Sequence, residues 1–173
     1  MDVQSFIASA LRFNQETCIA KTLRGLTDED LLYRPNAHTN PMGWLLWHQA
    51  RAEDGLFSRL SNTPQTWLTG QWHATFGMAP DPDDRGIGHS LEQVMAFRAT
   101  VAHLQGYAAA VREKTLATLQ SFTPEDLERE VPAFGGTRKV GELLGVFLID
   151  QLHHSGQVCY LRGSLTPGWS LWP

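Results

Sequence analysis

Residues 139–161, KVGELLGVFLIDQLHHSGQVCYL, hold the pattern that decides the fold. At 100° per residue the apolar side chains of this stretch fall in one narrow stripe, which is typical of a helix that packs one face against a core. The positions of the stripe are Leu143, Phe147, Val158 and Leu161. The stretch therefore predicts a helix from about Lys139 to Leu161 that ends before Gly163.

Three further segments carry the same helical periodicity. The first predicts a helix over about 3–22, with Phe6 and Phe13 on its apolar side. The second predicts a helix from an Asn40 N-cap to about residue 60. The third begins at a capping box of Ser90 and Gln93 and continues for roughly 30 residues, or about 45 Å if straight.

The stretches between these helices hold most of the Pro, Gly, Asp and Asn, and none shows a convincing strand alternation. The longest connection, residues 61–90, is polar and rich in Gly and Pro, with room for one short helix. Loops of this length in a small domain often carry function. The sequence predicts an all-α fold, a four-helix bundle in a single domain over residues 1–173 with a long loop after the second helix.

A weak internal repeat supports this arrangement. LTDEDLLYRP at 26–35 and FTPEDLEREVP at 122–132 each read as a short turn with a threonine N-cap and an acid two or three residues on. Further along, a Thr-x-x-x-Gly-x-Leu-Leu pattern occurs at 39–46 and again at 137–144. Two related helix pairs that pack into one bundle are the simplest explanation.

Composition excludes several classes of protein. The chain has 173 residues, 42% of them hydrophobic, and a net charge of −4. It is too apolar for disorder, has no unbroken apolar run of membrane length, and lacks the Lys/Arg cluster of nucleic-acid binding proteins. We therefore expect a soluble protein with neither a nucleic-acid nor a membrane partner. The opening MDVQSFIASALRFNQ resembles no signal peptide, so the expected location is cytoplasmic.

Histidine is the residue type that points to chemistry, since the chain has seven histidines and only two cysteines. Asp150 and His154 lie at the centre of the apolar stripe of the last helix, four residues apart. Burying both is costly unless they are paired or bound to an ion. One interpretation is a satisfied Asp–His pair in the core. The other is one edge of a metal site, because side chains at i and i+4 point the same way.

A third ligand would come from His48, which the second helix directs toward the bundle. Two imidazoles and a carboxylate leave coordination positions open for water or substrate, which suits Zn²⁺, Ni²⁺, Mn²⁺ or Fe²⁺. His153 lies off the centre of the stripe, so it is either a residue of the pocket rim or the ligand in place of His154. We favour His154 because its position is more central.

Two stretches, GWLLWHQARAED and DQLHHSGQVCYLRG, resemble the DinB-like superfamily of bacterial metal-binding four-helix bundles. The resemblance implies that His48 and His154 correspond to the metal histidines, and that Asp150 stands where most members have histidine. Some related isomerases are similar in combining one carboxylate with two histidines. The resemblance also implies an up-up-down-down bundle and a homodimer.

Two functional hypotheses follow. The superfamily includes thiol-dependent S-transferases and mycothiol-dependent maleylpyruvate isomerases, so the first is a metal-dependent enzyme that uses a low-molecular-weight thiol as co-substrate. In this enzyme His153 or Gln157 would position water or substrate. A related possibility is hydrolysis of the substrate by a metal-bound water. The second is a non-catalytic dimeric bundle for binding or stress response, whose metal site is degenerate. It is motivated by Asp150 at a ligand position and by the lack of an obvious second general base.

Overall fold

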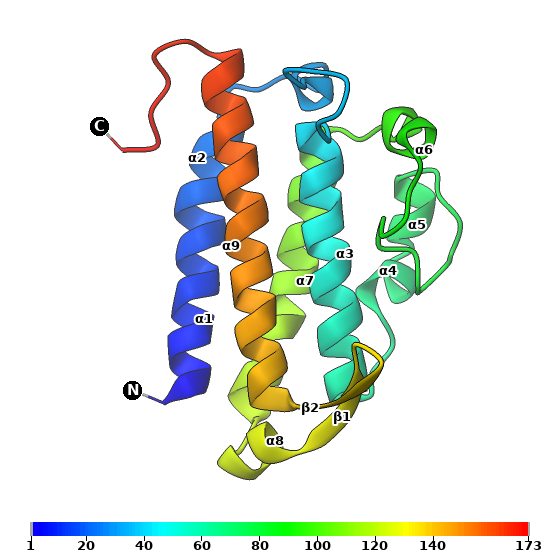
Figure 1. Cartoon of the computed structure of the whole chain (residues 1–173), viewed down its shortest axis with the longest axis vertical. Coiled ribbons are helices and arrows are strands. Elements are labelled where there is room, and N and C mark those ends of the chain that lie inside the picture. Colours follow the sequence, from blue (N-terminus) through cyan, green and yellow to red (C-terminus); the bar gives the residue numbers. More distant parts are fainter. Residues whose placement is uncertain (1, 173) are drawn as a thin grey trace.

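Four long helices form the bundle in the computed structural model, which describes residues 2–172 (Figure 1). The first is continuous through α1 (Val3–Phe13), the π-helical segment η1 (Asn14–Ile19) and α2 (Ala20–Leu23). The others are α3 (Met42–Ser61), α7 (Val101–Ser121) and α9 (Val140–Leu165). The all-α four-helix prediction is confirmed. No helix within these residues is long and apolar enough to cross a membrane.

The directions of the helices differ from the expected up-up-down-down order. α1 and α9 run one way, and α3 and α7 run the other way, so the order along the chain is up-down-down-up (Figure 1). Contacts at both ends agree with this order. Gln4 at the start of α1 donates to the carbonyl of Phe122 just after α7, and Arg162 near the end of α9 donates to Arg24 just after α2. The connection at 24–41 between α2 and α3 reverses the chain, whereas the longer connection at 62–100 returns beside α3, so that α7 starts at the same end of the bundle as α3 (Figure 1).

The expected third helix is broken in two. The Ser90–Gln93 capping box does begin α6, but this helix spans only Leu91–Ala96, and α7 starts afresh at Val101 behind a Thr100 N-cap. Between them Phe97 is extended, and its ring packs against Trp47 and Phe76 at centroid distances of 5.3 and 6.0 Å. The tertiary packing of one aromatic side chain thus overrides local helix propensity.

Smaller elements fill the connections. The long loop holds two short helices, α4 (Thr66–Thr69) and α5 (Trp72–Thr75), and the turns before α3 and α9 hold η2 (Asp30–Leu32) and α8 (Pro124–Glu128). A hairpin of β1 (Glu130–Ala133) and β2 (Gly136–Lys139) follows α8. The sequence reading missed this hairpin because its strands are short and mostly exposed, with no apolar alternation to show them.

The apolar face predicted for the first helix is partly wrong. Ile7 and Leu11 are buried, whereas Phe6 and Phe13 are more than half exposed. Asn14, three residues after Leu11, continues the buried face at ordinary helical spacing, and the two phenylalanines lie beside this face rather than on it. The last helix also runs past its predicted end, through Gly163 to Leu165.

The internal repeat is present in three dimensions. Thr27 and Asp30 exchange the same reciprocal capping bonds as Thr123 and Asp126.

A glycine at the start of the following long helix then packs against the leucine after the acid in each half of the chain. A Cβ on Gly43 would stand 3.2 Å from the Cβ of Leu31, and a Cβ on Gly141 would stand 3.4 Å from the carbonyl oxygen of Leu127. The two helix pairs therefore share the same capped turn and the same contact between a leucine and a helix glycine.

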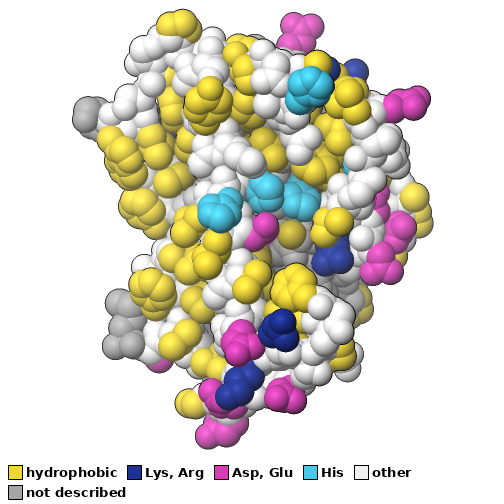
Figure 2. Space-filling model, in the orientation of Figure 1, with side chains coloured by type: hydrophobic (Ala, Val, Ile, Leu, Met, Phe, Trp, Pro, Cys, Tyr) yellow, Lys and Arg dark blue, Asp and Glu magenta, His cyan; other side chains and the backbone are white. Residues whose placement is uncertain are grey.

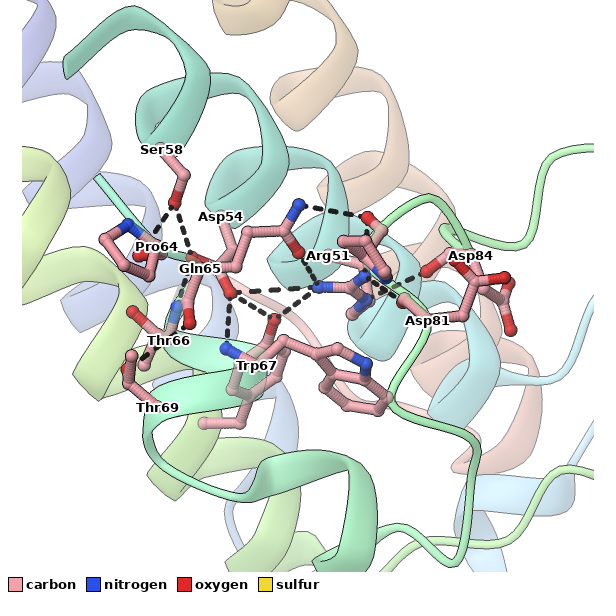
Figure 3. Close-up of polar contacts among 12 residues, drawn as sticks. Arg51, Asp54, Ser58, Pro64, Gln65, Thr66, Trp67, Thr69, Asp81 and Asp84 are labelled. Carbon is pink, nitrogen blue, oxygen red and sulfur yellow. Dashed lines mark hydrogen bonds and ion pairs between the residues drawn. The ribbon is translucent and has the colours of Figure 1, made fainter. Parts of the chain in front are cut away.

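The long loop is held against α3 by a buried arginine (Figure 3). The guanidinium of Arg51, fully buried, donates to the backbone carbonyls of Asp81, Pro82 and Asp84 at 2.9–3.1 Å. Asp54, one turn further along α3, accepts the backbone N–H groups that open α4. Because these carbonyls and N–H groups have buried charged partners, the path of the loop beside α3 is fixed.

Candidate metal centre

Three side chains with metal-ligating atoms converge between α3 and α9. His48 comes from α3, and Asp150 and His154 lie one turn apart on α9. One ligand atom of each lies within 4.8 Å of the other two. His48 is buried, whereas the side chains of Asp150 and His154 are 41% and 20% exposed. The set therefore lies at the solvent edge of the core, where Figure 2 shows histidines beside an acidic side chain, and not inside the core as the apolar stripe suggested.

His48 is held in one tautomer and one orientation. Its Nδ1 is hydrogen-bonded to the backbone carbonyl of Arg85. Because a carbonyl can only accept, Nδ1 carries the proton and Nε2 keeps the lone pair that a metal requires. The Trp44 ring stacks on the imidazole, with centroids 5.1 Å apart and planes 4° apart. Hydrogen bond and stacking together fix the direction of Nε2.

His154 has a similar outer contact. Its Nδ1 lies 2.7 Å from Oε1 of Gln157, one turn further along α9, and its Nε2 lies 3.5 Å from Oδ1 of Asp150. When the Gln157 oxygen accepts from Nδ1, the Nε2 atom is the one that faces the other two ligands. Gln157, predicted as a catalytic residue, is thus placed to orient a ligand.

The protonation of the set follows from its surroundings. Burial lowers the pKa of His48, against a smaller opposing effect of the Arg85 carbonyl. The hydrogen bond from His154 lowers the pKa of Asp150, and the same bond raises the pKa of His154. At neutral pH the set offers an anionic carboxylate and a neutral His48 imidazole.

A buried polar network lies directly behind the ligands. Each ligand residue is followed in the chain by a buried polar residue, namely Gln49, Gln151 and Ser155. Gln49 donates to the Gln151 carbonyl at 2.8 Å and to Ser155 Oγ at 3.0 Å, and Gln151 donates back to the Gln49 carbonyl at 3.1 Å. Asn14 of η1 also donates to Ser155 at 2.8 Å. These bonds fix the register of α3 against α9, and so the spacing of the ligands.

The donor set fits a divalent transition ion. Ligand bonds of about 2.0–2.2 Å place two ligand atoms up to roughly 4 Å apart, so a small rotation of the half-exposed Asp150 would close the set around an ion. Two imidazoles and a carboxylate suit Zn²⁺, Ni²⁺, Mn²⁺ or Fe²⁺, and three protein ligands leave positions open. His48, Asp150 and His154 would hold such an ion.

The sequence did not predict two hydrogen-bonding contacts next to the site. Neither Trp44 nor His89 is among the site residues that the sequence predicts. Trp44 Nε1 donates to His89 Nδ1 at 3.3 Å, and His89 Nε2 lies 2.9 Å from Asp84 Oδ1. A chain of contacts thus connects the long loop to the ring that stacks on His48. The periodicity of α3 could have placed Trp44 and His48 on one side, one turn apart, but the position of His89 depends on the path of the loop.

Two hollows flank the ligands. One, here called the ligand groove, has a volume of about 290 Å³, and both His48 and Asp150 line it. The other, here called the outer depression, has a volume of about 540 Å³ and is lined in part by His153, Gln157 and Tyr160. The structure therefore groups His154, and not His153, with the other two donors, and places His153 on the wall of the outer depression.

Comparison with known proteins agrees with the fold. The sequence profile of the DinB superfamily matches residues 16–158, a range that contains all three donors. The chain belongs to the DinB superfamily. No curated protein matches it. Among solved structures, this DinB chain is similar to the crystal structure of a conserved protein from Enterococcus faecalis, with a TM-score of 0.82 and 24% identity over 94% of this chain and 96% of that one.

Proposed function

We propose that this DinB-superfamily protein is a metal-dependent enzyme acting on small molecules in the cytoplasm, and that it joins a low-molecular-weight thiol to an electrophile or uses the thiol to isomerise one. The observation that carries the proposal is the convergence of His48, Asp150 and His154, with an outer hydrogen bond on each histidine ring. The outer bond of His48 leaves its Nε2 free toward the other two donors, an orientation that a purely structural histidine does not need.

The surroundings of the donor set suit a reaction between two small molecules. His48 and Asp150 line the ligand groove, and Gln157, which contacts His154, lines the outer depression, so a reactant could reach the donor set from either hollow. A divalent cation held there would favour the thiolate form of a substrate thiol at neutral pH. Gln157 holds the ring of His154, and His153 is available to hydrogen-bond a reactant in the outer depression.

Elemental analysis of protein purified without a metal-affinity tag tests the proposal. We expect about one transition ion per chain, lost in His154→Ala and retained in His153→Ala, which removes an exposed histidine from the same helix. His48→Ala should also lower the melting temperature of the metal-loaded protein, because the bound ion stabilises the folded state. A wild-type protein that takes up no ion after dialysis against Zn²⁺ or Ni²⁺ would overturn the proposal and favour a non-catalytic bundle.

A further inference from the structure

Two arginines line the ligand groove without a protein partner. These are Arg59 of α3 and Arg85 of the long loop. Neither guanidinium makes a hydrogen bond or an ion pair with any residue between 2 and 172, although other arginines of the chain do, such as Arg51 and Arg112. A free guanidinium beside a groove is a donor for an anionic ligand group, which it can bind through two parallel N–H bonds.

Two residues of α3, Gly55 and His48, determine the position of Arg85. Its side chain lies across Gly55, where a Cβ would stand only 3.3 Å from the Arg85 Cδ. Its backbone is held as well, because the carbonyl of Arg85 accepts from His48. Gly55 follows His48 by seven residues, which is about 10 Å along the helix axis. The aliphatic part of the Arg85 side chain thus lies beside α3 about two turns beyond His48.

The rest of the groove is apolar. Leu56 of α3 and Phe147 of α9 form part of its lining, and Phe134 of the β1–β2 turn and Ile87 of the long loop border it. Phe134 and Ile87 are each 75% exposed, more than any other large apolar side chain of residues 2–172. Figure 2 shows the hollow below the histidines with hydrophobic and basic side chains around it.

The backbone of Phe134 suggests that its side chain has a role outside the fold. Its φ is +51°, and the next residue, Gly135, has a φ of +73°. Two successive positive φ angles at a two-residue hairpin turn are typical of Asn-Gly, and a bulky residue at the first position is disfavoured. The chain therefore places an exposed aromatic ring at the edge of the groove at a cost in stability.

We propose that the ligand groove binds an organic anion with an apolar body, its anionic group at Arg85 and Arg59 and its reactive end at the donor set. The inference rests on the proposed function, because it names the chemical class of one reactant of that site. The apolar walls and Phe134 would cover the body of the molecule. Asp150 is the one acidic residue among the described residues of the groove lining, which also holds two arginines.

Binding to the metal-free protein isolates this anion site from the metal. In the presence of a chelator, the affinities of 4-phenylbutanoate, its neutral amide 4-phenylbutanamide and 3-phenylpropyl phosphate would be measured by NMR titration. We expect the carboxylate to bind at least fivefold more tightly than the amide. The relative affinities of 4-phenylbutanoate and 3-phenylpropyl phosphate show whether the anionic group of the natural ligand is a carboxylate or a phosphate.

Variants identify the residues responsible. Arg59→Gln combined with Arg85→Gln should bring the affinity ratio of carboxylate to amide close to one. Arg12→Gln removes an exposed charge from α1 and should leave the ratio unchanged. An equal affinity of the wild type for carboxylate and amide, or a ratio unaltered in the double variant, would overturn the inference. Because no metal is present, these results are independent of whether the purified protein carries an ion.

Phe134→Asn supplies a second measurement that a folding defect cannot imitate. Asparagine tolerates the positive φ, so the melting temperature should rise or stay the same. The affinity for the carboxylate and for the amide should both fall by about threefold or more, with their ratio kept. A variant that binds both probes as tightly as the wild type would contradict the role of Phe134 as a wall of the groove.

Discussion

His48 and His154 each have one ring nitrogen engaged by a neighbouring oxygen, from the Arg85 carbonyl and from Gln157. Such outer contacts orient the ligating nitrogen and raise its basicity. The acceptor for His48 belongs to a loop that is distant in sequence, whereas the acceptor for His154 belongs to the same helix. Gln157 can therefore be substituted without disturbing the loop.

Gln157→Leu should weaken metal binding by about 10- to 100-fold, because the His154 ring loses the acceptor that fixes its tautomer. Gln157 is exposed, so the melting temperature of the metal-free protein should change little. Competition with a chromophoric chelator would give the affinity. Gln157→Glu keeps an acceptor oxygen and serves as the control, and equal affinities of the Leu variant and the wild type would rule out an orienting role.

Asp150 can be tested by two opposite changes. Asp150→Asn should weaken the binding of Zn²⁺ at least tenfold, because a neutral amide is a much poorer ligand than a carboxylate. Asp150→His should retain binding, because two histidines at i and i+4 of one helix can chelate one ion. The same chelator competition measures both. Tight binding by the Asn variant would mean that Asp150 only hydrogen-bonds to His154.

Helical periodicity predicts the donor residues of the site but not the contacts that the long loop makes with them. The 3.6-residue repeat of α3 and α9 was enough to predict that His48 and the Asp150/His154 edge share a site. It could not predict the Arg85 carbonyl, whose place depends on the path of a loop held by the buried Arg51 guanidinium. Every residue has a backbone carbonyl, so the sequence does not indicate which carbonyl of a loop will accept a given hydrogen bond.

Among the elements, the contact of α3 with α9 determines the spacing of the ligands. Gln151→Leu removes the donor to the buried carbonyl of Gln49. We expect a loss of about 0.5–1.5 kcal/mol in the free energy of unfolding, since one buried hydrogen bond between the two helices is lost. Urea denaturation of the metal-free protein measures it, with Gln120→Leu on the exposed side of α7 as control. Equal losses in the two variants would argue against a special role for the network.

The capping box of α8 predicts a dependence of stability on pH. The backbone and side-chain hydrogen bonds from Thr123 lower the pKa of Asp126 below its ordinary value of 3.8. A carboxyl whose pKa is lower in the folded state stabilises the protein fully above its ordinary pKa, and this contribution is lost as the pH falls through the folded value. Asp126→Asn should therefore lower the melting temperature at pH 7 and have a smaller effect near pH 3. A constant difference between wild type and variant across this range would contradict the assignment.

Two elements differ from the sequence prediction, each for its own physical reason. The Ser90 capping box was recognised correctly, yet its helix ends early because Phe97 packs on Trp47 and Phe76. The hairpin of β1 and β2 was missed because it is stabilised by backbone bonds and a turn rather than by an apolar face. Local patterns predict where an element starts better than how tertiary packing ends it.

For the whole molecule, we propose that a second copy of the chain covers the face formed by α1 and α9. Large apolar side chains there are about half exposed, among them Phe6 on α1 and Ile149 and Leu152 on α9. Figure 2 shows hydrophobic side chains gathered over these two helices. Exposed apolar surface of this kind is more typical of an interface than of a monomer.

Phe6→Glu combined with Leu152→Glu should convert the dimer into a monomer, because two charges would be buried without partners at the interface. Light scattering coupled to size exclusion gives the mass, and circular dichroism verifies the fold. Ile87→Glu places the same charge on an equally apolar, exposed position beside the groove and should leave the mass unchanged. A wild-type protein that elutes as a monomer at micromolar concentration would refute the proposed dimer.

The duplicated plan of the two helix pairs extends to the site itself. The register that pairs Gly43 with Gly141 also pairs three positions on α3 with three on α9. The pairs are His48 with Val146, Ala52 with Asp150, and Leu56 with His154. Every donor thus has an apolar counterpart, and these counterparts, Ala52, Leu56 and Val146, all line the ligand groove. Corresponding positions of the two helices thus differ in chemistry, with a polar donor at one member of each pair and an apolar side chain of the groove lining at the other.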